Sequence, residues 1–137
     1  MSERRIDAFF YGLFMDSEVL GKSGVEVVNP RRGYVQDFAL FIGNRATLIA
    51  MPQQRSYALV MSVTHTDVHR LYSGVGLEDY VPEALLVNLI GQHSLPALCY
   101  NLLNPPRPDE ANHDYAIKLK EALSRLEFPA EYIASIT

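Results

Sequence analysis

Turn-forming residues cut this sequence into short apolar runs, and this division constrains the fold more than any other feature. Gly12, Gly33 and the pair Gly43-Asn44 each end such a run or separate two of them. Short runs rich in β-branched and aromatic residues between turns are typical of strands. We therefore expect strands over residues 6–11, 34–42, 46–50, 57–63, 84–90 and 97–103, with a further extended piece at 25–28.

Two turns are expected to link the central strands. Gly43-Asn44 is a tight-turn signal and predicts a hairpin between residues 38–42 and 46–50. Pro52-Gln53-Gln54 predicts a second turn, which leads into a long central strand at 57–63.

Helical segments are few and mostly short. Asp16 is suited to cap a helix over residues 16–20 that stops at Gly21. Thr64 or Thr66 is expected to cap a second helix over residues 66–72, which stops at Gly74. Many short strands with few helices indicate an α+β domain built on a closed or rolled sheet.

The C-terminal helix has the clearest periodicity. Its apolar face is formed by residues spaced four, three and four apart: Tyr115, Leu119, Ala122 and Leu126. Glu121 and Arg125 lie on the other side, at the spacing of a helical ion pair. Pro129 ends the helix, and residues 130–136 are expected to form one more turn.

Composition and charge exclude several classes of protein. The 137 residues are 48% hydrophobic, which is enough for the core of one domain over residues 1–137. The single cysteine, Cys99, excludes an internal disulfide and a four-cysteine zinc site. A net charge of −4 without a basic stripe gives no reason to expect nucleic acid. No apolar run reaches the roughly 18–20 residues of a membrane helix, so we expect a cytoplasmic protein with no membrane partner.

The common catalytic and cofactor motifs are missing or incomplete. His65 and His69 have the spacing of two metal ligands on a helix, but the sequence places no third ligand, and a partly exposed helix face is the alternative. No G-x-S-x-G elbow anchors a serine triad, and no P-loop is present to hold a nucleotide. Cys99 lies in an apolar strand, where a core role is expected. We expect neither a metal nor a cofactor.

The junction at residues 9–16 is the remaining candidate site. A strand ends at Gly12, and a short helix begins a few residues later. Consecutive backbone N–H groups at such a junction can hold an anion or a carboxylate. An ordinary strand-to-helix turn is the alternative.

The same junction carries a resemblance to a known family. Residues 9–20, FFYGLFMDSEVL, resemble the N-terminal signature of the γ-glutamylcyclotransferase-like family, which includes the AIG2-like proteins. In that signature a strand runs into Y-G-[ST]-L, often followed by M-x-x-x-x-L, and four residues match it: Tyr11, Gly12, Met15 and Leu20. The apolar strand at 57–63 and the helix ending in Leu71-Tyr72 also resemble the family, in the expected order over roughly residues 6–103.

The resemblance implies a fold, a pocket and a reaction. The fold would be a small mixed β-barrel or roll with short flanking helices. The pocket would lie where the loop at 11–14 meets the loop after Tyr72. Known enzymes of the family cyclise a γ-glutamyl group to 5-oxoproline and release the attached amine without a cofactor, using a carboxylate to move the proton and backbone N–H groups to hold the substrate. The residues expected to bind it are Tyr11, Gly12, Leu13, Phe14, Ser73 and Tyr80.

The sequence departs from the family at two places in this site. Ser73 stands where the family's Y-E-G loop has its catalytic glutamate, and Leu13 stands where the family prefers serine or threonine. Glu78, five residues after Ser73, is the preferred substitute carboxylate, and a solvated loop acid is the alternative for it and for Glu83.

Three hypotheses about function follow. The first is a cofactor-free γ-glutamyl amide cyclotransferase with Glu78 as the relocated catalytic carboxylate. The second is a catalytically inactive protein that binds a small metabolite in the same pocket. The third is an interaction module, expected as a homodimer, whose pocket is vestigial.

Overall fold

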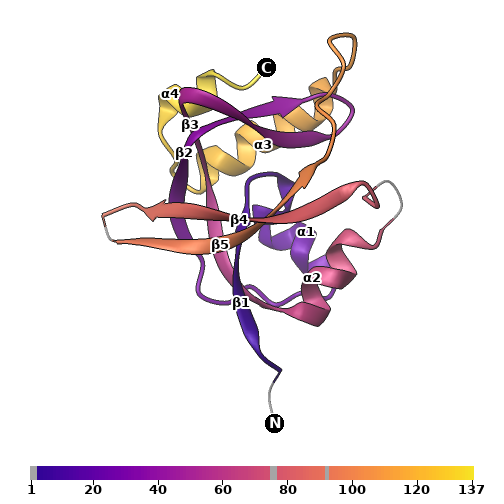
Figure 1. The fold of residues 1–137 in the computed structure, drawn as a ribbon, viewed down its shortest axis with the longest axis vertical. Coiled ribbons are helices and arrows are strands. Elements are labelled where there is room, and N and C mark those ends of the chain that lie inside the picture. Colours follow the sequence, from indigo (N-terminus) through magenta and orange to yellow (C-terminus); the bar gives the residue numbers. More distant parts are fainter. Residues whose placement is uncertain (1–2, 75–76, 92) are drawn as a thin grey trace.

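The computed structural model describes residues 3–74, 77–91 and 93–137, which form five strands and a set of short helices (Figure 1). The strands are β1 (Arg5–Phe10), β2 (Arg31–Ile42), β3 (Ala46–Thr64), β4 (Tyr80–Leu89) and β5 (Ser94–Leu102). The helices are the 3₁₀ turn η1 (Leu13–Met15), α1 (Ser17–Lys22), α2 (His65–Tyr72), α3 (His113–Arg125) and α4 (Ala130–Ala134). The α+β class predicted from the sequence is therefore confirmed.

The five strands form one sheet that closes on itself. The strand order is β1-β3-β2-β4-β5; all these neighbours are antiparallel, and the parallel pairing of β5 with β1 at Ala8 and Leu98 completes the ring. β2 and β4 meet only at Gly33–Leu89 and Tyr34–Asn88. A Cβ atom on Gly33 would lie 2.7 Å from Val87 Cγ1, so glycine is required where these two strands cross.

The predicted turn at 52–54 does not separate two strands. β3 runs unbroken from Ala46 to Thr64, and the residues around Pro52 form a bulge within it. Gln36 pairs with Arg55 and Phe38 with Ala50, so Asp37 alone faces residues 51–54. Asp37 and Gln53 both have left-handed φ angles, 67° and 68°, and the Gln53 N–H donates to Asp37 Oδ1 at 2.9 Å. This hydrogen bond holds the pKa of Asp37 below its usual value and fixes the bulge.

Local signals at other turns are confirmed or corrected. Asp16 caps α1 by accepting from Glu18 N, as predicted, and Thr64, one of the two predicted candidates, caps α2 by accepting from Asp67 N. α1 runs through Gly21 to Lys22 instead of stopping there. Residues 25–28 are not a strand, although Val28 O accepts a bond from Ser62 N at 3.0 Å.

Two further expectations are corrected near the C-terminal half. β4 begins at Tyr80, before the predicted start, and contains Pro82. Pro82 pairs with Tyr100 of β5, but β4 pairs with β2 only at its far end, so one side of β4 is unpaired at Pro82, and proline is tolerated at such edge positions. Arg125 bonds Asp16 Oδ2 at 3.0 Å, not the predicted partner Glu121.

The sheet is buried on both of its faces along β1 and the second half of β3, whereas much of β4 is exposed. Phe9 points into the closed sheet with residues such as Val60 and Cys99, whereas its neighbour Phe10 points outward and packs with the helices. Burial raises the pKa of the Cys99 thiol, as expected for the core role predicted from the sequence. The outer core lies beneath α1, α2, α3 and α4. No helix in the described ranges is long and apolar enough to cross a membrane.

The contribution of α3 to the outer core can be measured directly. Leu119 is fully buried and Ile117 is 55% exposed on the same helix. Leu119→Ala is expected to lower the free energy of unfolding by about 2–5 kcal/mol, because it removes core contacts and leaves a cavity. Urea denaturation measures it, with Ile117→Ala as the matched control, expected within about 0.5 kcal/mol of the parent. Equal losses for both variants would contradict the placement of this helix.

Candidate functional site

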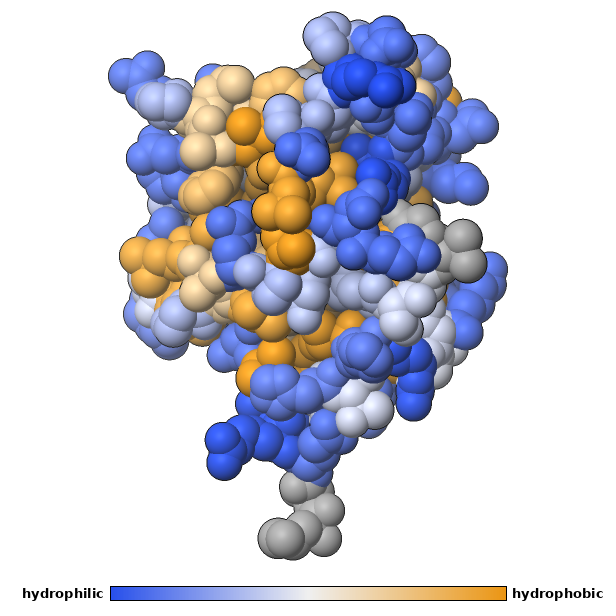
Figure 2. Space-filling model, turned by 45° about the vertical axis from the view of Figure 1, so that its right-hand side comes forward, coloured by the Kyte–Doolittle hydropathy of each residue, from blue (hydrophilic) through white to orange (hydrophobic). Residues whose placement is uncertain are grey.

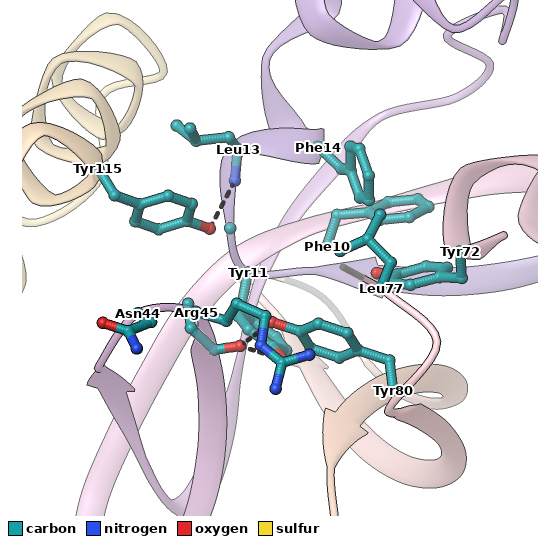
Figure 3. A pocket seen from close by; sticks show the side chains of 12 residues that line it. Phe10, Tyr11, Leu13, Phe14, Asn44, Arg45, Tyr72, Leu77, Tyr80 and Tyr115 are labelled. Atoms are coloured by element: carbon teal, nitrogen blue, oxygen red, sulfur yellow. Dashed lines mark hydrogen bonds between the residues drawn. The ribbon is translucent and has the colours of Figure 1, made fainter. Parts of the chain in front are cut away.

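A cavity of about 230 Å³ opens where five segments meet (Figure 3). These segments are the end of β1 with its following loop, the start of β3, the end of α2, the residues around the start of β4, and α3. The lining residues are Phe10, Tyr11, Gly12, Leu13, Phe14, Asn44, Arg45, Ala46, Tyr72, Leu77, Tyr80 and Tyr115. The segments are distant in sequence, and the closed sheet brings them together.

Aromatic rings form the apolar wall of the cavity. Phe14 packs edge-on against Phe10 and Tyr72, with ring centroids 6.4 and 5.4 Å apart. Tyr72 in turn stacks on Tyr100 at 4.1 Å and lies 5.7 Å from Tyr80. Edge-to-face and stacked pairs of this kind are favourable and restrict the ring positions. The wall is therefore a connected aromatic cluster.

Tyrosine hydroxyl groups near the cavity are bonded to the backbone. Tyr11 Oη donates to Tyr100 O at 2.7 Å, and Tyr80 Oη donates to Ala46 O. Burial raises the pKa values of Tyr11, Tyr72 and Tyr80 above the ordinary value of a tyrosine. These side chains are consequently neutral at physiological pH, and the Tyr11 and Tyr80 hydroxyls act as hydrogen-bond donors, not as bases.

The backbone at Gly12 and Leu13 is linked to the C-terminal part of the chain. The Leu13 N–H, one of the groups that the sequence predicted for anion binding, donates to the Tyr115 hydroxyl of α3 at 3.2 Å (Figure 3). Gly12 has φ −109°, an ordinary value, so its glycine is not explained by conformation. A Cβ atom at Gly12 would collide with the Tyr115 hydroxyl, and space is the reason for glycine here.

Arg45 is the only charged residue among the described residues that line the cavity. Its guanidinium lies 6.0 Å from the centre of the Tyr80 ring, and its Nη2 is 3.1 Å from Asp79 Oδ2. Arg45 directly follows the Gly43-Asn44 hairpin turn. The sequence predicted that turn, but which loops the hairpin tip would face depends on long-range strand pairing. Sequence reasoning missed Arg45 for this reason. It missed Tyr115 because the packing of α3 against the loop after β1 is also a long-range contact.

Five of the seven predicted site residues line the cavity. They are Tyr11, Gly12, Leu13, Phe14 and Tyr80. Ser73 is exposed at the end of α2, and its hydroxyl donates to Arg70 O at 3.1 Å. Glu78 is also exposed and is not a lining residue, although its neighbour Leu77 is. Val75, which the sequence also suggested for the pocket wall, lies outside the described residues.

The remaining candidate side chains lie outside the cavity. Glu83 is exposed and accepts a hydrogen bond from the amide of buried Asn101. His65 and His69 are exposed on α2. Within the described ranges, no three histidine, cysteine, aspartate or glutamate side chains gather as they would around a metal ion.

Solved structures with the same fold identify the architecture. The sequence matches no protein-family model and no curated protein. Its structure is similar to a γ-glutamyl cyclotransferase, with 18% identity, 98% of this chain and 89% of that chain covered, and a TM-score of 0.78. It is also similar to a yeast γ-glutamyl cyclotransferase specific to glutathione, with 15% identity, 96% and 93% covered, and a TM-score of 0.66. An AIG2-like protein from mouse aligns with 16% identity, 80% and 90% covered, and a TM-score of 0.56. The chain therefore has the γ-glutamylcyclotransferase-like fold that its sequence resemblance implied.

The close approach of Gly12 and Tyr115 can be tested with a double-mutant cycle. Gly12→Ala is expected to lower the free energy of unfolding by about 1–3 kcal/mol, because the added methyl group displaces the Tyr115 hydroxyl. Tyr115→Phe removes that hydroxyl, so the same glycine substitution should cost less in its background. Chemical denaturation of the four proteins measures the coupling. Additive effects would contradict a direct contact.

Proposed function

We propose that this protein binds a small organic molecule in the cavity beside the loop after β1. An open cavity of about 230 Å³ that is lined mainly by aromatic and aliphatic side chains supports this proposal most directly. An apolar cavity of about 150 Å³ can hold benzene, and pockets for drug-sized ligands span about 300–1,000 Å³. The ligand is accordingly a metabolite a little larger than a single aromatic ring.

Binding without catalysis is the form of the proposal that the geometry favours. General acid–base catalysis needs a titratable group within hydrogen-bond reach of the reacting atoms, directly or through one water. The described lining residues include no carboxylate and no histidine. Their tyrosines are neutral donors, because burial raises the pKa values of Tyr11, Tyr72 and Tyr80.

A cyclotransferase that uses Glu78 is the second candidate. Glu78 follows the lining residue Leu77 directly, so a change in this loop could bring its carboxylate to the cavity. In the reaction, the α-amino nitrogen attacks the γ-carbonyl carbon and the amide C–N bond breaks. Glu78 would take the proton from the attacking nitrogen and return it to the departing amine, so no cofactor is needed.

Location and assembly also belong to the proposal. We place the protein in the cytoplasm, where a buried free thiol such as that of Cys99 is the usual state of a cysteine. A homodimeric interaction module remains the alternative function. Its support is the exposure of large apolar side chains such as Leu86 and Leu103, 62% and 74% exposed, and Figure 2 shows apolar surface gathered on one face among hydrophilic residues.

Filling the cavity should abolish ligand binding. Leu77→Trp adds bulk at a half-buried lining position, whereas Leu86→Trp adds the same bulk at an exposed position outside the cavity. Binding of small aromatic fragments, followed by amide chemical shifts in NMR spectra, is expected for the parent and Leu86→Trp and is expected to be lost in Leu77→Trp. A parent protein that binds no fragment would refute the proposed function.

The catalytic candidate predicts 5-oxoproline release from γ-glutamyl amides. If Glu78 is the base, Glu78→Gln lowers the rate by about 10²–10⁴-fold, while Glu121→Gln, at an exposed glutamate on α3, leaves it unchanged. Ser73→Glu restores the carboxylate at the family position and is assayed alongside. No turnover by the parent, with a gain in Ser73→Glu, would identify a binding site that lacks its base.

A further inference from the structure

The charge of the residues that line the cavity favours anionic ligands. Arg45 supplies its only charged group within the described lining, and the other polar lining groups are tyrosine hydroxyls, the Asn44 amide and backbone atoms. The tyrosines stay neutral because burial raises their pKa values, so none of them opposes an anion at physiological pH. The lining therefore has a net positive charge.

The ion pair between Arg45 and Asp79 is exposed enough for a ligand carboxylate to replace Asp79. Its side chain is 36% exposed, and Asp79, its ion-pair partner at 3.1 Å, is 72% exposed. Ion pairs with so much solvent access contribute little free energy. A second carboxylate, that of Glu110, is held nearby by the Asn44 and Arg107 N–H groups. A ligand carboxylate in the cavity would thus compete with Asp79 for the Arg45 guanidinium.

The aromatic wall complements the other end of such a ligand. The Phe14 and Tyr72 rings pack edge to face at 5.4 Å beside Phe10. Leu77, which lies between α2 and β4, completes this apolar wall (Figure 3). A flat apolar group packs favourably against rings held in this way. A guanidinium can bind a carboxylate through two parallel hydrogen bonds, which also fixes its orientation.

We propose that the ligand is a small organic monocarboxylate with a flat apolar body, its carboxylate bound by Arg45 and its body packed against Phe10, Phe14 and Tyr72. This proposal rests on the proposed function and specifies its ligand class. A free γ-glutamyl group is a poorer match, because its α-ammonium would meet no carboxylate in the described lining and would be repelled by Arg45.

Calorimetric titration with matched probes tests the ligand class. The probes are phenylacetate, its uncharged isostere phenylacetamide, and L-glutamate as a polar zwitterionic control. We expect phenylacetate to bind at least tenfold more tightly than phenylacetamide, and L-glutamate to bind more weakly than either. Equal affinity for the acid and the amide would overturn the role of the carboxylate, and tighter binding of L-glutamate would overturn the ligand class.

Three substitutions test whether Arg45 binds the ligand carboxylate. Arg45→Met keeps much of the side-chain bulk without the charge and is expected to weaken phenylacetate roughly 10- to 100-fold, the range of charge-assisted hydrogen bonds, with little effect on phenylacetamide. Arg55→Met is the matched control, since Arg55 also lies over a tyrosine ring, that of Tyr34, but outside the cavity. Asp79→Asn removes a carboxylate that pairs with Arg45 and should tighten the binding of phenylacetate by up to about fivefold.

The outcomes separate this proposal from the one on which it rests. If no probe and no fragment binds the parent protein, the cavity is not a ligand site and both proposals fail. If phenylacetamide binds and Arg45→Met leaves the affinity for phenylacetate unchanged, ligand binding stands and the carboxylate proposal is wrong. A selective loss of phenylacetate binding in Arg45→Met, absent in Arg55→Met, supports it.

Discussion

β3 pairs with β2 from Ala46 to Val60 and with β1 from Leu59 to Thr64, and the closed sheet depends on this pairing with two neighbours. Leu59 and Val60 pair with β1 on one side and with β2 on the other. The two neighbouring strands are thereby held in a fixed register, and the side chains of β1 alternate between the inside of the closed sheet and the helices. Phe9 is buried in the core inside the closed sheet, and Phe10 is buried in the core beneath the helices. A shift of one residue would exchange the two sets and bury the wrong faces.

The cavity exists because the sheet brings remote segments to one place. Tyr11 bonds the backbone of Tyr100, Leu13 bonds Tyr115, and Tyr80 bonds the backbone of Ala46, across sequence separations of 89, 102 and 34 residues. Each of these contacts satisfies a polar group that would otherwise be costly to bury. The aromatic side chains that remain enclose an apolar space with Arg45 at its edge.

Much of the fold could be predicted from local signals, and the errors have physical reasons. Glycine and asparagine at the hairpin turn and Asp16 as a helix cap act within a few residues and are predicted correctly, and Thr64 is one of the two caps predicted for α2. Pro52 predicts a turn between two strands, but a hydrogen bond from the Gln53 N–H to the Asp37 carboxylate on the neighbouring strand accommodates the extra residues as a bulge. The strand-to-helix junction and the family resemblance both indicate the loop at 11–14, whereas Arg45 and Tyr115 reach the cavity only through tertiary structure. The positions of Ser73 and Glu78 outside the lining also depend on how the loop before β4 folds.

The parallel contact between β1 and β5 has a consequence for the order of folding. It joins positions 8 and 98, whereas the hairpin of β2 and β3 and that of β4 and β5 join residues close in sequence. Closing a long loop costs more chain entropy than closing a short one, so long-range pairings tend to form after local ones. During synthesis β1 leaves the ribosome long before β5, so the apolar residues of β1 have no contact with β5 until that strand has been made. The two hairpins can assemble early, while the ring and the cavity beside it are completed last.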